Sequence, residues 1–174
     1  MLARDGTTMI GDVTTRPGAR VVRIDLIGTT LFLVALAIAI PARNQRYGQL
    51  LIAGVSMALF AIGVATALWA YTRALDRSRV EEVGVANLFL LTGDTAPRSV
   101  RRAMKAFLAI QVVAAVAGAW IGVVGLEKGE LNALAFGVLV PMFGIGMNGV
   151  WAALHGSYGP RVRGTVSPTD HEIG

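Results

Sequence analysis

One group of basic residues in the chain has a spacing suited to binding phosphate groups. The group follows Pro97, in a Thr-Ala-Pro sequence that is typical of a helix start. Intervals of three and four positions place its members on one face of that helix: Arg98, Arg101, Arg102 and Lys105. Beside an anionic membrane surface each such side chain contributes about 1 kcal/mol. The spacing predicts that this basic stripe contacts lipid head-groups or a membrane partner, unless it only anchors the helix at the interface.

A second group of polar residues lies inside the long apolar stretches, about six positions from one end of each. This polar layer consists of Thr29, Thr66, Gln111 and Asn148. Such groups either join helices by hydrogen bonds worth about 0.6 to 2 kcal/mol each or line a pocket for a substrate group or head-group. Asp25 stands at the very start of its apolar stretch. We therefore expect an interior without ionisable groups, which argues against proton-coupled transport.

Groups suited to catalysis are few. The sequence has no cysteine and two histidines, His155 and His171, and it lacks zinc-protease, serine-hydrolase and phosphate-loop motifs. The glycines from Gly144 to Gly149 match a dinucleotide-binding pattern, but they follow no strand and lie within an apolar run. We therefore expect no enzyme, cofactor or metal site. A lipid-modifying enzyme with its site at the cytoplasmic interface is the remaining enzymatic alternative.

The composition indicates a membrane protein. The chain has 174 residues, of which 54% are hydrophobic, and its mean hydropathy is +0.59, well above that of soluble domains. The net charge of +5 is formally compatible with nucleic-acid binding. However, the basic residues flank apolar stretches instead of forming a soluble basic domain, so anionic lipid is the expected counter-charge and no nucleic-acid partner is expected.

The apolar stretches are long enough to cross a bilayer. They predict an all-α fold, a four-transmembrane-helix bundle of two antiparallel hairpins within residues 21–156, joined by a cytoplasmic segment at 73–103. Flexible tails are expected at residues 1–20 and 157–174. A cleaved signal peptide is a less favoured interpretation of the first stretch. The predicted spans are residues 24–42, 50–72, 104–125 and 131–154.

The distribution of positive charge predicts the orientation. Of the 16 Lys and Arg residues, eleven lie in the tails or the 73–103 segment, and Arg23 and Lys105 adjoin these parts on the same side, which makes thirteen; Arg43, Arg46 and Lys128 lie on the other side. Basic residues resist transfer across the membrane. Both termini and the 73–103 segment are therefore expected in the cytoplasm, and the protein in a bacterial plasma membrane as a multi-pass component.

Two local patterns bear on how the helices pack. Pro141 interrupts the fourth stretch, which predicts a kink near Gly137; a gating hinge formed by these two residues is the functional alternative. In the third stretch, small residues at every fourth position favour close packing within the bundle over a dimer face. These residues are Ala114, Gly118 and Gly122.

Several segments resemble uncharacterised four-span integral membrane proteins of actinobacteria. They are NLFLLTG at 87–93, LAFGVLVP at 134–141, Trp151 and GSYGPR at 156–161. The resemblance covers about residues 20–161. It implies a bacterial source and a four-span fold, and it implies no activity.

These observations favour a non-enzymatic accessory or scaffold protein that contacts anionic lipid or a membrane partner. The alternative is a small oligomeric transporter or channel, for which the polar layer and Pro141 are the motivation. A homo-oligomer is compatible with both.

Overall fold

The computed structural model describes residues 18–81, 83–124 and 132–159. Most of the two predicted tails lies outside these ranges. The regular elements are helices: α2 (Ala19–Ala39), α3 (Arg46–Arg77), α4 (Val85–Leu90), α5 (Arg98–Val123), the 3₁₀-helix η1 (Ala133–Leu139) and α6 (Pro141–His155). The predicted all-α class is therefore confirmed.

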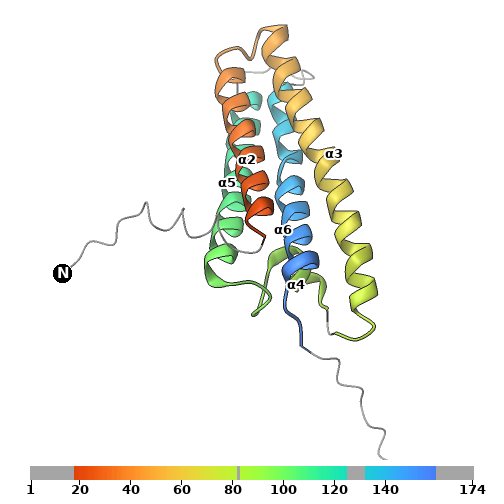
Figure 1. Ribbon diagram of the computed structural model, residues 1–174. Helices are drawn as coiled ribbons and strands as arrows, with labels where there is room; N and C mark the ends of the chain where they lie inside the picture. The colour runs from red at the N-terminus through yellow and green to blue at the C-terminus, as the bar shows by residue number, and fades with distance from the viewer. Residues whose placement is uncertain (1–17, 82, 125–131, 160–174) are drawn as a thin grey trace, which may run out of the picture.

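Four helical units are long and apolar enough to cross a membrane: α2, α3, α5, and η1 together with α6. They lie side by side as a bundle, and the short α4 lies across one end (Figure 1). Helix α6 packs most extensively against α3 and also contacts α2 and α5. The predicted four-helix bundle is thus present, with α6 in contact with every other long helix.

The surface of the bundle is apolar along its length. Large side chains stand out from each of the first three long helices, with exposed fractions of 65% for Ile27, 61% for Leu68 and 69% for Val113. Small side chains such as Ala70 lie inside. Because water would make so much exposed apolar surface unfavourable, this distribution fits a bundle surrounded by lipid.

The helices begin and end at different residues from the predicted spans. Helix α2 begins at Ala19, five positions before the predicted 24–42 span. Helix α3 extends past both ends of 50–72, and α5 begins at Arg98, well before 104. These extensions arise because a helix continues into the interfacial region, where apolar content no longer marks its end.

The hydrogen-bond pattern of the fourth unit is interrupted at Val140, where a 3₁₀-helix changes to an α-helix while the backbone stays right-handed helical. The 3₁₀-helix η1 ends at Leu139, and Pro141 occupies the first turn of α6. Proline has no N–H to donate, and its ring clashes with a preceding α-helical turn, so it is favoured as the first residue of a new helix. The break in the hydrogen-bond pattern therefore lies at Val140, and Gly137, near which the kink was predicted, lies within η1.

Glycines allow α3 and α6 to approach closely. A Cβ atom on Gly63 would lie 2.5 Å from the backbone oxygen of Met142, and one on Gly146 would lie 2.4 Å from the backbone oxygen of Gly63. Gly118 and Gly122 of the small-residue set face Leu36 and Leu134 inside the bundle. Close backbone approach within the chain accounts for these glycines.

The short helix α4 is docked onto the bundle. Leu88 and Leu91 are fully buried, and α4 contacts α6 and the end of α3. The side-chain amide of Asn148 donates a hydrogen bond to the carbonyl oxygen of Phe89 over 3.0 Å. The start of α2, α4, the start of α5 and the end of α6 all lie at this end of the bundle (Figure 1), which we call the basic end.

Candidate functional site

A buried polar cluster joins α2, α5 and α6. At its centre is the fully buried Gln111 of α5. Its Nε2 donates to Thr29 Oγ1 over 2.7 Å and to Asp25 Oδ1 over 3.3 Å. Its Oε1 accepts a hydrogen bond from the backbone N–H of Gly144 over 3.2 Å. One amide side chain thus connects three membrane-spanning helices.

The break before Pro141 explains the bond to Gly144. The first backbone N–H groups of a helix have no partner within that helix. The N–H of Phe143 is satisfied by the carbonyl of Val140 over 2.8 Å, and that of Gly144 by Gln111. Because α6 begins inside the bundle, where water is scarce, a side chain from another helix must supply this acceptor.

Asp25 lies in the cluster, so the prediction of an interior without ionisable groups is wrong. Its side chain has an exposed fraction of 0%. Oδ1 is bonded to Gln111, and Oδ2 has no hydrogen-bond partner among the described residues. Since α2 begins at Ala19, Asp25 lies almost two turns inside the helix instead of at its start.

Thr29 lies one turn beyond Asp25 on the same face of α2. Its hydroxyl donates to the backbone carbonyl of Asp25 over 2.8 Å and accepts from Gln111. The four-residue spacing of Asp25 and Thr29 is a signal from which the sequence could have indicated that the two share a face. The sequence did not reveal which residue binds Asp25 and Thr29, because Gln111 is distant along the chain.

The other members of the predicted polar layer lie outside the cluster. Thr66 donates to carbonyls of its own helix, those of Ile62 and Gly63, over 2.7 and 3.0 Å. Asn148 binds Phe89, as described above, and its Oδ1 has no partner among the described residues. The structure therefore brings Thr29 and Gln111 together and gives Thr66 and Asn148 separate contacts.

The basic stripe occupies the first turns of α5, at the basic end. Arg98, Arg102 and Lys105 are exposed. Arg101 is partly buried, and its guanidinium donates to the carbonyl oxygen of Gly93. Three of the four positive charges therefore face outward, and the fourth holds the turn that precedes α5.

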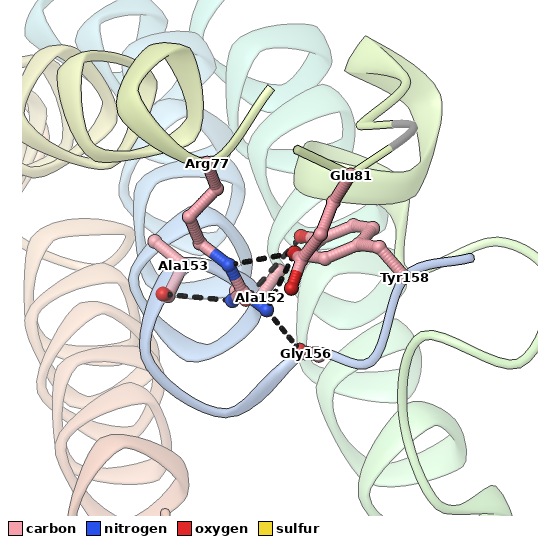
Figure 2. Close-up of polar contacts among 6 residues, drawn as sticks. All are labelled: Arg77, Glu81, Ala152, Ala153, Gly156 and Tyr158. Atoms are coloured by element: carbon pink, nitrogen blue, oxygen red, sulfur yellow. Dashed lines mark hydrogen bonds and ion pairs between the residues drawn. The ribbon is translucent and has the colours of Figure 1, made fainter. Parts of the chain in front are cut away.

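A second polar centre, which the sequence did not reveal, surrounds Arg77 at the end of α3 (Figure 2). Its guanidinium forms an ion pair with Glu81 at 2.8 Å. It also donates to the carbonyl oxygens of Ala153 over 3.2 Å and Gly156 over 3.0 Å. The same group lies 4.8 Å from the centre of the Tyr158 ring.

The polar groups around Arg77, which we call the Arg77 centre, bind carbonyl groups at the end of α6. The last carbonyls of a helix lack partners within it and carry partial negative charge, which favours a cation there. Tyr158 adds to this by donating its hydroxyl to the carbonyl of Ala152 over 3.2 Å. Burial raises the pKa of the Tyr158 phenol above its ordinary value of 10.0, while the positive charge of Arg77 acts in the opposite direction. These contacts satisfy carbonyl groups at the end of α6.

The two proposed hinge residues have different surroundings. A Cβ atom on Gly137 would lie 3.3 Å from the ring of Phe32, so this glycine packs against α2. Pro141 is the first residue of α6.

Within residues 18–81, 83–124 and 132–159, the His, Asp and Glu side chains form no group of three that could hold a metal ion.

Comparison with known proteins gave no match to a family, to a curated protein or to a solved structure. The resemblance to actinobacterial four-span proteins therefore stays a prediction.

Proposed function

We propose that the chain is a non-enzymatic integral membrane protein of the bacterial plasma membrane. It acts as an accessory or scaffold component, and its basic stripe contacts anionic lipid head-groups. The observation that carries this proposal is the exposure of Arg98, Arg102 and Lys105 on α5, beside the apolar surface of the bundle. A membrane-protein partner with an acidic surface is the other contact that this chemistry would suit.

The position of the stripe supports the proposal. A helix that enters a membrane with cationic groups on one face brings them to the depth of lipid phosphates. The excess of Lys and Arg at this end also favours a cytoplasmic location, where bacterial membranes present anionic lipid. Arg101 is held by Gly93, so we expect it to contribute less to lipid binding than its three neighbours.

The test is lipid retention measured by native mass spectrometry. The triple variant Arg98→Gln, Arg102→Gln and Lys105→Gln should retain several-fold fewer phosphatidylglycerol or cardiolipin molecules than the wild type. The control is Arg46→Gln, which removes an exposed charge at the opposite end of the bundle. Equal retention by the triple variant and the wild type would exclude the stripe as a lipid site; co-purification of a stoichiometric protein that the triple variant loses would favour the partner.

The second candidate function is a small oligomeric transporter or channel. The observation that favours it is the cluster of Asp25, Thr29 and Gln111 beside the broken fourth helix. Discontinuous helices with polar groups at the break form the binding sites of many transporters. A carboxyl group among them also removes the objection that the interior has no ionisable group.

Flux into proteoliposomes tests this candidate. A salt or pH gradient across vesicles containing the protein should dissipate faster than across empty vesicles. Gln111→Leu should abolish the difference, because it disconnects the three helices. Thr66→Val, which changes a polar group outside the cluster, serves as the control. Dissipation at the rate of empty vesicles would reject transport of the ions tested.

A further inference from the structure

Among the described residues Asp25 is the only buried carboxyl group. One of its oxygens binds Gln111, and the other has no partner. We propose that Asp25 is a reversible proton-binding site inside the membrane-spanning bundle. The site consists of Asp25 on α2, Gln111 on α5 and the start of α6.

An ionised carboxylate in an apolar interior is strongly unfavourable unless a cation compensates its charge. Asp25 Oδ2 is the oxygen atom of the cluster that has no hydrogen-bond partner among the described residues, so the cation binds there. Thr29 Oγ1 both donates and accepts, and Gln111 Oε1 accepts from Gly144. Hard metal cations need about six or more oxygen ligands. A proton needs only one, so the site fits a proton.

Charged groups on the neighbouring elements lie toward the helix ends. Those near the basic end are Arg20 and Arg23 on α2, Arg73, Asp76 and Arg77 on α3, Arg98, Arg101, Arg102 and Lys105 on α5, and His155 on α6; Arg46 lies at the other end of α3. Of these, Arg23 is two residues from Asp25 along α2, and the nearest on α5, Lys105, is six residues from Gln111, or about 9 Å at 1.5 Å per residue. The hydrogen-bond partner of the Asp25 carboxyl is the neutral amide of Gln111, and proton binding supplies the compensating charge.

The cluster also contains groups that stabilise the ionised carboxylate of Asp25. Gln111 Nε2 donates to Asp25 Oδ1, and a donor stabilises a carboxylate more than a neutral acid. Gln111 Oε1 in turn binds the N–H of Gly144, at the positive end of the α6 dipole. The negative charge on Asp25 is thereby coupled through one side chain to the start of α6.

The contact between α2 and α6 gives a direction for proton exchange. Helix α2 contacts α6 on both sides of Asp25, since Gly28 meets Phe143 and Gly18 meets Trp151. Along this stretch of α6, Asn148 Oδ1 and Trp151 Nε1 are buried polar atoms without partners. Trp151 Nε1 lies beside Gly18 at the basic end, and the Cα of Asp25 is about 9 Å from the start of α2 along the helix axis. Protons exchange with Asp25 from the basic end.

This inference deepens the transport candidate by naming its ion, and it depends on that candidate only for net movement of protons. Binding at Asp25 is measurable without any flux. Infrared difference spectra along a pH series, recorded on the full chain in liposomes, detect the C=O band of a protonated carboxyl. A carboxyl in apolar surroundings absorbs at higher frequency than a solvated one.

We expect the wild type to show such a high-frequency band, which changes reversibly with pH. Asp25→Asn should lose it, and Asp76→Asn, which alters an exposed carboxyl on α3, should keep it. Gln111→Leu should shift the band to still higher frequency, because the carbonyl loses its donor. If Asp25→Asn does not fold, the shift of the band in Gln111→Leu tests whether the band belongs to Asp25.

Absence of a high-frequency band at every pH, or a band that survives in Asp25→Asn, would overturn the proposal. A band with all the expected properties but no proton flux in vesicles would support the site and reject the transport candidate. The two proposals can therefore fail separately.

Discussion

The side-chain oxygen of Gln111 on α5 accepts a hydrogen bond from the backbone N–H of Gly144 on α6 over 3.2 Å. A residue of one membrane-spanning helix thereby caps the start of another, inside the bundle. The same amide holds Asp25 and Thr29 on α2. One side chain thus connects the carboxyl group on α2 with the start of α6.

Gln111→Leu should lower the free energy of unfolding by about 1 to 3 kcal/mol, because it leaves buried polar groups on α2 and α6 without partners. Circular dichroism during titration with a denaturing detergent measures this change. Gln45→Leu, at an exposed position before α3, should change stability by less than about 0.5 kcal/mol. Similar effects of the two variants would mean that the cluster adds nothing to helix association.

Two glycines of α3 should respond differently to the same substitution. Gly63→Ala places a methyl group 2.5 Å from backbone atoms of Met142 and Phe143, and we expect a loss of about 1 to 3 kcal/mol from overpacking. Gly54→Ala enters open space and should leave stability unchanged or raise it by up to about 1 kcal/mol, since alanine favours helix. The same detergent titration tests both. A tolerated Gly63→Ala would contradict the close contact between α3 and α6.

Arg77→Gln should loosen the end of α6. It removes the donors to Ala153 and Gly156 and the ion pair with Glu81, at a cost of about 1 to 2 kcal/mol for a partly exposed site. Hydrogen exchange measures the effect at the amides of Gly156 and Ser157, which donate to Ala152 and Thr95. Exchange there should become faster in Arg77→Gln and remain unchanged in the control Arg79→Gln, which alters an exposed charge beyond the centre.

The Tyr158 phenol should ionise only above its ordinary pKa, since burial raises the pKa from 10.0. The folded protein then retains a proton that the unfolded chain has already released. Stability is therefore unaffected below pH about 10 and falls as the pH rises through the raised pKa. Tyrosinate absorbance during an alkaline titration, compared between the wild type and Tyr158→Phe, isolates this group. Ionisation of Tyr158 below pH about 10 would contradict its burial.

Much of the fold could be predicted from the sequence, because the relevant signals are local. The length and hydropathy of each apolar stretch predict a span, and the three- and four-residue spacing from Arg98 to Lys105 predicts the stripe. Pro141 marks a disruption of the fourth span. Its form, a 3₁₀-helix followed by a new α-helix, differs from the predicted kink because the packing of η1 on α3 and α5 also determines the backbone there.

The candidate site was only partly predictable. Thr29 and Gln111 were recognised as polar groups at similar depth, and the structure joins them. Asp25 was assigned to the end of its span, because hydropathy locates an apolar stretch but not the first residue of its helix. Arg77 was not recognised, because its acceptors are backbone carbonyls, which every residue has and no sequence pattern distinguishes.

The sequence by itself determined that the chain forms four apolar helices with basic groups concentrated toward one side. Both properties follow from residue types and spacings along a single segment. Only the tertiary structure decided that Asp25 is enclosed, that Gln111 caps α6 and that Thr66 and Asn148 have separate partners. These outcomes depend on the rotation and depth of each helix relative to its neighbours, which the packing of small residues between helices sets and no single segment encodes.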